Sequence, residues 1–208
     1  MSPAASQVGQ QTYKPNRLEE VLDSIFEKLF LHASTNMNVT DRKILYDGHY
    51  KLTQLLVQDG NDQLKRERFE PGQAVGALVF DSRKQRYLFV RQFRVGPEAE
   101  VLEIPAGMLD ASDQSPEQAI RREIEEELGY KVNQLLPITE CFPSPGNSAE
   151  KFYLYYAEVR EQSGPGGGVA DEHEQIEVVE LSREQLATEP WQDAKTLVAV
   201  QWERLRQR

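Results

Sequence analysis

Cysteine is almost absent from this sequence, in which Cys141 is the only one among 208 residues. A single thiol can form no intrachain disulfide and can supply no cysteine zinc site, which favours a reducing compartment. Long apolar runs are also missing, since no stretch reaches the roughly 18 uninterrupted apolar residues of a transmembrane helix. Residues 1–16 lack the basic start and apolar centre of a signal peptide. We therefore expect a cytoplasmic protein with no membrane partner.

Positive charge is scarce, because 24 Lys and Arg residues face 34 Asp and Glu residues and give a formal net charge of −10. Nucleic acids are bound by fields of Lys and Arg, so we expect no nucleic-acid partner. A small phosphorylated substrate is compatible with this acidity, because divalent cations can bridge phosphates to carboxylates. The length suits one main domain with a smaller appendage.

The N-terminal third contains three segments of different character. Residues 1–16 have little to bury, which predicts a disordered tail. Apolar residues recur at helical spacing from Leu18 to Phe30 and predict an amphipathic helix. Residues 43–69 hold short β-prone runs separated by turn signals, which predict a small antiparallel unit. We expect residues 17–70 to comprise this helix and β unit, and residues 71–208 to form the main domain.

The rest of the chain predicts an α/β fold around a mixed sheet. Ser115 suits a helix N-cap, Pro116 the first helical position and Gly129 a C-terminal cap, so a helix is predicted over residues 116–128. A second helix is predicted from Asp193 through Leu205. The glycine-rich residues 163–168 predict an irregular loop. Strands are predicted over residues 74–80, 87–93, 101–104, 152–159 and 176–181.

The helix predicted over residues 116–128 carries three carboxylates on one face. Glu123, Glu126 and Glu127 fall within an arc of about 100°, beside an apolar stripe. Such a cluster at the rim of a core can converge on Mg²⁺, which prefers oxygen ligands. A solvated acidic face is the alternative, and the helix pattern alone leaves both interpretations open.

The surrounding sequence extends this pattern. Gly107 followed by residues 122–130, REIEEELGY, resembles the Nudix box, which consists of a glycine, a glutamate and then Arg-Glu-aliphatic-x-Glu-Glu-x-Gly-aliphatic. The spacing from Gly107 to Arg122 is one residue longer than in the usual box. The first glutamate of the box is replaced by Asp113 or Gln114, depending on the end from which one counts.

The resemblance covers roughly residues 43–205 and points to the ADP-ribose pyrophosphatase and GDP-mannose hydrolase branch of the Nudix superfamily. It implies an α/β/α sandwich with a mixed sheet as the catalytic domain, residues 71–208. The antiparallel unit and the additional helix within residues 17–70 would precede this domain and contribute to a homodimer. Residues 1–40 fall outside this resemblance. The segments that carry the resemblance outside the box are residues 90–94, 103–107, 144–150 and 169–176.

Metal and catalytic roles follow from the same resemblance. It implies Mg²⁺-dependent hydrolysis of the diphosphate of a nucleoside diphosphate sugar, first of all ADP-ribose to AMP and ribose 5-phosphate, with Mn²⁺ as a substitute metal. Glu172 would be the general base, and Glu126 a further catalytic carboxylate. The implied metal ligands are the Ala106 carbonyl and the carboxylates of Glu123, Glu126, Glu127 and Glu174.

Four substrate-binding residues are implied as well. Arg94 would contact the diphosphate or the terminal ribose, because its planar guanidinium suits phosphate geometry. Arg66 would reach the substrate of the neighbouring subunit, His49 stands where an aromatic residue stacks on the base, and Glu150 belongs to the loop after the box. For Arg66 and His49, an ordinary surface or core position explains the sequence equally well.

Three alternatives remain at this stage. The substrate could be GDP-mannose or another nucleotide sugar, because the GGGV run at residues 166–169 resembles the GDP-mannose hydrolases, although the following ADEHEQI fits the ADP-ribose enzymes better. The chain could be a non-catalytic Nudix-like nucleotide sensor. It could also act as an interaction protein through its N-terminal helix.

Overall fold

The computed structural model describes residues 37–168 and 176–207. The predicted tail, the helix from Leu18 to Phe30, and both Glu172 and Glu174 lie outside the described residues. The elements in chain order are β1 (Asn38–Asp47), β2 (Lys51–Asp59), β3 (Asp62–Glu70), β4 (Gln73–Asp81), β5 (Arg86–Arg94), β6 (Ala99–Glu103), β7 (Ala106–Met108), α2 (Pro116–Leu128), β8 (Tyr130–Cys141), β9 (Lys151–Gln162), β10 (Glu177–Leu181), α3 (Arg183–Thr188) and α4 (Ala194–Arg206).

The described chain forms two compact units. One comprises residues 37–41 and 56–65, and the other comprises residues 42–55, 66–168 and 176–207. Strands β1, β2 and β3 form a three-stranded sheet in that order, which confirms the predicted antiparallel unit. Gly60 supplies a positive φ of 57° at the turn between β2 and β3, a conformation that glycine adopts without strain.

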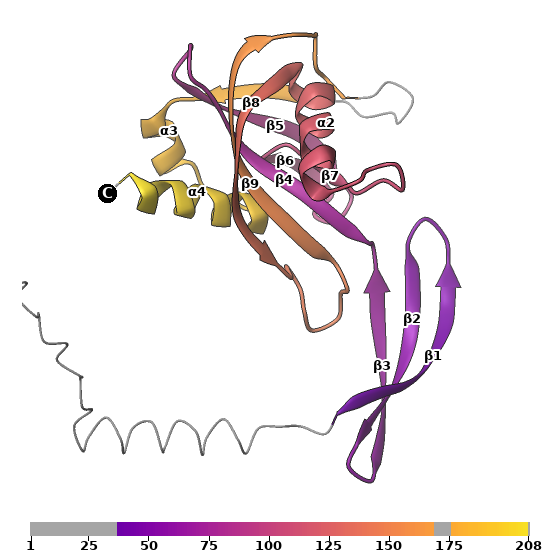
Figure 1. The fold of residues 1–208 in the computed structure, drawn as a ribbon. Coiled ribbons are helices and arrows are strands. Elements are labelled where there is room, and N and C mark those ends of the chain that lie inside the picture. Colours follow the sequence, from indigo (N-terminus) through magenta and orange to yellow (C-terminus); the bar gives the residue numbers. More distant parts are fainter. Residues whose placement is uncertain (1–36, 169–175, 208) are drawn as a thin grey trace, which may run out of the picture. The chain divides into compact units, whose positions relative to one another are not determined.

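The second sheet is mixed and forms the centre of the larger unit (Figure 1). Its strand order is β10-β5-β4-β9-β8, with β6 paired to β5 and β7 paired to β4. Strands β4 and β9 run parallel, and the other described pairs in this sheet are antiparallel. The predicted mixed sheet is therefore confirmed.

Helices cover both faces of this sheet, as Figure 1 shows. Strand β4 is apolar on both sides, because its residues alternate between two cores. Val75, Ala77 and Val79 pack with α2, whereas Ala74 and Leu78 belong to the core that includes α3 and α4. The predicted α/β/α sandwich is confirmed.

Helix α2 occupies the predicted residues because both of its ends are specified locally. The Ser115 side chain accepts a hydrogen bond from the Gln118 backbone N–H, and Pro116 begins the helix. At the other end Gly129 takes a left-handed conformation with φ of 75°, and its N–H donates to the Glu125 carbonyl. Both ends of the helix are thereby fixed, and its acidic face lies beside strand β7.

Three elements were not predicted. Strand β7 spans only three residues, too few for a strand signal in the sequence. Strand β8 contains Pro137 and several register shifts against β9, so its sequence lacks the clean alternation that predicts a strand. Helix α3 spans only six residues, although Ser182 and Gln185 form a capping box that marks its start. None of the described helices is both long and apolar enough to cross a membrane.

Candidate active site

The carboxylates of α2 are directed toward the short strand β7. Glu123 and Glu127 are 8% and 2% exposed, so the alternative of a solvated acidic face is wrong for these two residues. The Ala106 backbone N–H donates a hydrogen bond to Glu127 Oε2 at 3.2 Å. This contact places the backbone of Ala106 beside the helix carboxylates, as a shared metal site would require.

Gly107 has a physical reason to be glycine. A Cβ atom at this position would lie 2.1 Å from the carboxylate of Glu123, a distance that no real contact shows. The carboxylate therefore rests directly against the Gly107 backbone. Any side chain at this position would push Glu123 away from Ala106 and Glu127.

Arg122 is the centre of an ion-pair cluster around the same helix. Its burial alone would lower the pKa, but hydrogen bonds and charges from the surrounding carboxylates outweigh burial and raise the pKa of Arg122. The guanidinium therefore stays charged. Its partners are Glu123 at 2.8 Å, Glu126 at 2.8 Å, Asp113 at 3.1 Å and Asp110 at 3.3 Å.

The structure distinguishes between the two candidates for the first acidic position of the box. The Asp113 side chain bonds to Arg122 and accepts a hydrogen bond from the Asp110 backbone N–H at 2.9 Å. The hydrogen bond from Arg122 holds the pKa of Asp113 below its usual value. Gln114 donates its backbone N–H to Gln118 Oε1. The longer loop thus places Asp113 against Arg122.

A cleft of about 1160 Å³ opens beside this cluster. It is large enough for a nucleotide-sized ligand, since ligand pockets of about 300–1,000 Å³ are usual. The predicted site residues that line it are His49, Arg94, Ala106, Glu123, Glu126, Glu127 and Glu150. Arg66 lies exposed on β3 and does not line the cleft, so its predicted role toward a neighbouring subunit stays a prediction.

Two further cations, Arg94 and Lys195, also line the cleft and together form its cationic wall. Glu103 is 1% exposed and pairs with both Arg94, at 2.5 Å, and Lys195. Burial would lower the pKa of Arg94, but Glu103 outweighs it and raises that pKa. Asp193 holds the other side of the Lys195 ammonium at 2.8 Å. Both positive groups are therefore held in place at the cleft.

Lys195 was not among the predicted site residues, although the sequence contains one signal for it. Asp193 was expected to begin the closing helix, and its side chain does accept the Thr196 backbone N–H at 2.9 Å. A lysine in the first turn of a helix opposes the helix dipole, which favours acidic groups there. Such a misplaced charge indicates a role outside the helix.

The end of the cleft that carries His49 also contains Tyr50. The two rings contact each other edge to face with centroids 4.4 Å apart, and Tyr50 contacts Phe69 at 5.0 Å. Glu150 lies half-buried in the cleft, where burial and the nearby Asp193 raise its pKa against the opposing effect of Lys195. These groups offer aromatic and hydrogen-bonding surface next to the charged walls.

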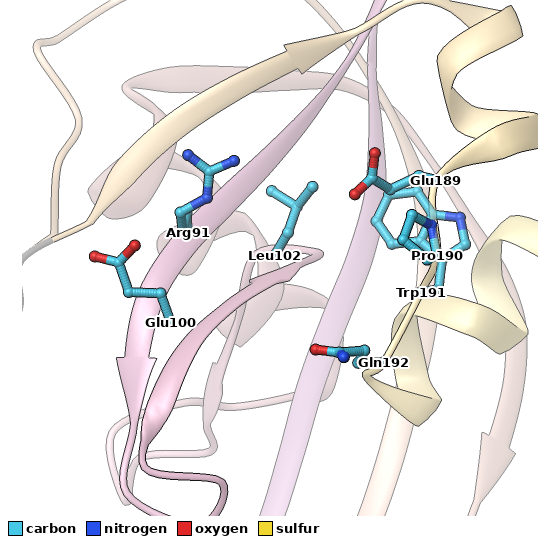
Figure 2. Close-up of a pocket in the computed structure, with 7 residues that line it drawn as sticks. All are labelled: Arg91, Glu100, Leu102, Glu189, Pro190, Trp191 and Gln192. Carbon is cyan, nitrogen blue, oxygen red and sulfur yellow. The ribbon is translucent and has the colours of Figure 1, made fainter.

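A second hollow lies on the other face of β6, and Figure 2 shows the residues around it. Leu102 faces this hollow, whereas its neighbours Val101 and Glu103 face the large cleft, as the alternation of a strand requires. The volume of this second hollow is only about 230 Å³. Arg91, which lines it, pairs with Glu177 at 2.7 Å. The large cleft is therefore the better candidate for a nucleotide-sized ligand.

The carboxylates beside Ala106 suit a hard divalent cation, because carboxylate and carbonyl oxygens are its preferred ligands. Within residues 37–168 and 176–207, no three His, Cys, Asp or Glu side chains are already grouped as a metal site. Glu123 and Glu126 are both directed at Arg122. The donor set fits the metal, and the predicted ligand Glu174 lies outside the described residues.

Comparisons with known proteins agree with this geometry. The model of the NUDIX domain family matches residues 70–200. GDP-mannose pyrophosphatase from Cronobacter sakazakii is 34% identical over 190 residues, covering 83% of this chain and 97% of that protein. The enzyme of the same name from Klebsiella pneumoniae is 33% identical over 186 residues, covering 81% and 92%. A solved structure described as an ADP compounds hydrolase has a TM-score of 0.69 at 20% identity over 82% of this chain and 93% of its own, and it shows the same fold.

Proposed function

This chain belongs to the NUDIX domain family and is a hydrolase, and from that premise we propose that it cleaves the diphosphate bond of nucleoside diphosphate sugars. One observation carries the proposal: a single cleft is lined both by the clustered carboxylates of α2, its carboxylate wall, and by two held cations, Arg94 and Lys195. A diphosphate needs metal-bridged contact to the carboxylates and direct contact to the cations. The cleft offers both.

The carboxylate wall would hold Mg²⁺, with Mn²⁺ as a substitute. The ligands would be the Ala106 carbonyl and the carboxylates of Glu123, Glu126 and Glu127, together with Glu174. When bound, the divalent ions neutralise the diphosphate oxygens and stabilise the charge of the leaving phosphate. Gly107 keeps Glu123 in position by leaving room for its carboxylate.

The cationic wall would bind and orient the diphosphate. Arg94 and Lys195 are held by Glu103, so they meet the phosphates with little loss of side-chain freedom. The ring of Tyr50 next to His49 offers a surface for the base, and Glu150 accepts hydrogen bonds from sugar hydroxyls.

The proposed reaction adds water across the diphosphate. The water oxygen forms a bond to one phosphorus, the bond from that phosphorus to the bridging oxygen breaks, and the bridging oxygen leaves on the other phosphate. Glu172 takes the proton of the attacking water as general base, and Glu126 is a second carboxylate near the reacting groups. The products are a nucleoside monophosphate and a sugar phosphate.

Two substrates lead the proposal. GDP-mannose is favoured by the names of the relatives that share a third of their residues with this chain over most of its length. ADP-ribose is favoured by the ADEHEQI run at residues 170–176, which resembles the ADP-ribose enzymes. We place GDP-mannose first, which reverses the order expected from sequence alone. A homodimer that uses residues 17–70 is proposed for either substrate.

The test is a substrate panel of GDP-mannose, ADP-ribose and ADP-glucose, each incubated with Mg²⁺ or with a chelator and analysed by chromatography. We expect Mg²⁺-dependent release of a nucleoside monophosphate and a sugar phosphate, with one substrate clearly preferred. Binding of all three nucleotides without turnover would reject the hydrolase proposal and favour the nucleotide sensor.

A further inference from the structure

The glycine-rich loop of residues 163–168 packs against the C-terminal end of α2, beyond its Gly129 cap. A helix leaves its last carbonyl groups without partners inside the helix. Here the N–H groups of Gly167 and Gly168 donate to the carbonyls of Glu127 and Glu126, at 2.8 Å and 3.2 Å. The N–H groups of Ser163 and Gly164 donate to the Gly129 carbonyl at 2.7 Å and 3.0 Å. The Ser163 hydroxyl also donates to the Gly129 carbonyl, at 3.2 Å, and the other contacts named here use backbone groups.

Glycine is required for this close contact. A Cβ on Gly129 would lie 2.2 Å from the Gly164 carbonyl oxygen, and a Cβ on Gly166 would lie 2.7 Å from the Glu127 carbonyl oxygen. Gly166 and Gly167 also have positive φ values of 66° and 96°, which other residues adopt with strain. Side chains at these positions would lift the loop off the helix end.

The capped carbonyls belong to the residues that matter for the site. Glu126 and Glu127 supply both the backbone acceptors for the loop and the side chains of the carboxylate wall. The last turn of a helix frays readily when its carbonyls have no donors. We infer that the loop of residues 163–168 is a positioning element, which holds the last turn of α2 so that Glu126 and Glu127 present their carboxylates to a divalent cation.

This inference rests on the proposed function only in assigning those carboxylates to the metal. It concerns backbone contacts that are made before any substrate binds. Groups that orient metal ligands without touching the metal change metal affinity or activity by roughly 10–100-fold when removed. The loop should therefore act on metal affinity and turnover more strongly than on global stability.

The test compares Gly166→Ala with a matched control, Gly164→Ala. The control adds the same methyl group where nothing lies within 4 Å, whereas the test variant places it against the Glu127 carbonyl. Binding of Mn²⁺ alone is measured from the electron paramagnetic resonance signal of the free ion. We expect the dissociation constant for Mn²⁺ to rise about tenfold in Gly166→Ala and to stay unchanged in Gly164→Ala.

General destabilisation is controlled by Val200→Ala, a cavity variant of a fully buried residue in the core on the other face of the sheet. Mn²⁺ affinity unchanged in Gly166→Ala, or reduced equally in Val200→Ala at matched loss of melting temperature, would overturn the inference. If Gly166→Ala fails to fold, Gly167→Ala replaces it in the test. The added methyl group of Gly167→Ala contacts nothing within 4 Å, but alanine is strained at the positive φ of this residue.

Turnover is measured separately on the same proteins. A fall in kcat with KM within threefold would agree with positioning of the metal ligands. If the wild-type protein hydrolyses no nucleotide sugar, the proposed function fails, yet the Mn²⁺ comparison still decides whether the loop positions the carboxylates.

Discussion

Glutamates are buried on both faces of the main sheet, but their surroundings differ. On the α4 face, Glu203 is 1% exposed and accepts hydrogen bonds from the Tyr87 hydroxyl at 2.7 Å and from Arg206 Nε at 2.7 Å. Gln207 donates to the same carboxylate. One negative charge thus has one cation and two neutral donors around it, away from the cleft.

On the α2 face, several carboxylates gather beside one guanidinium. Four of them pair with Arg122, and Glu127 lies next to them. This arrangement leaves an excess of negative charge at the cleft, which a divalent cation can neutralise. A buried carboxylate that is matched by its own donors therefore stabilises the fold, whereas an excess of carboxylates at a cleft indicates a binding site.

The largest effect is expected at Glu127. We expect Glu127→Gln to lower kcat by more than about 100-fold, because loss of a metal ligand should exceed the effect of losing a group that only orients one. Steady-state kinetics on the preferred substrate measure this effect. Glu125→Gln on the exposed side of the same helix serves as the control, since its side chain is 51% exposed. Near-normal turnover in Glu127→Gln would contradict the hypothesis that the carboxylates of α2 belong to the active site.

The cationic wall is tested at Lys195. Lys195→Met removes the ammonium and should raise KM by roughly 10–100-fold, the range expected for the loss of a hydrogen bond from a charged group. Lys84→Met is the control, because Lys84 forms an ion pair of the same kind with Glu180 on the surface. Equal KM values in the two variants would show that Lys195 serves only to neutralise Glu103.

The α4 face should respond in stability and leave activity unchanged. Burial raises the pKa of Glu203, but hydrogen bonds from Arg206, Tyr87 and Gln207 outweigh burial and lower it overall. A lowered pKa in the folded state means stability that is present above the unfolded value of 4.5 and is lost as pH falls below it.

Glu203→Gln should therefore lower the free energy of unfolding by about 1.5 kcal/mol at neutral pH. The free energy of unfolding of this variant should also fall less steeply than that of the wild type as the pH is lowered into the acid range. Urea titrations between neutral pH and acid measure both effects. A variant that keeps the stability of the wild type at neutral pH, or that loses turnover, would contradict the distinction between the two faces.

The smallest effect is expected at Asp113. Asp113→Asn removes one of the four carboxylates that pair with Arg122 and keeps a hydrogen-bond acceptor there. We expect kcat to fall only severalfold, because the guanidinium retains its other partners. Gln114→Ala is the matched neighbour, and an equal or larger loss in that variant would assign the first acidic position of the box differently.

Local sequence signals predicted the elements that local contacts determine. Helix α2 could be assigned from Ser115 and Gly129 because both caps act within a few residues of the helix ends. Strand β8 was not predicted, because it contains Pro137 and its bulges arise only through pairing with β9, which lies later in the chain. The carboxylates of α2 were identified for the same reason as the helix, since their spacing alone places them on one face.

The cationic wall could not be predicted in this way. Glu103 and Lys195 are 92 residues apart in sequence, and nothing near either residue indicates the other. The sequence likewise left open whether Asp113 or Gln114 replaces the first glutamate of the Nudix box. In the structure, Asp113 is the residue that contacts Arg122. Long-range contacts decide both points, and sequence patterns over short windows do not contain them.

The parallel pairing of β4 with β9 has a consequence for folding. Gln73 and Asp81 at the ends of β4 lie opposite Lys151 and Val159, so the centre of the sheet forms only after a long segment of chain has been closed into a loop. Such non-local pairing slows folding, because the entropy of loop closure is lost before the contacts form. The cleft also needs the contact between Lys195 of α4 and Glu103, which are 92 residues apart. Activity should therefore return after secondary structure during refolding.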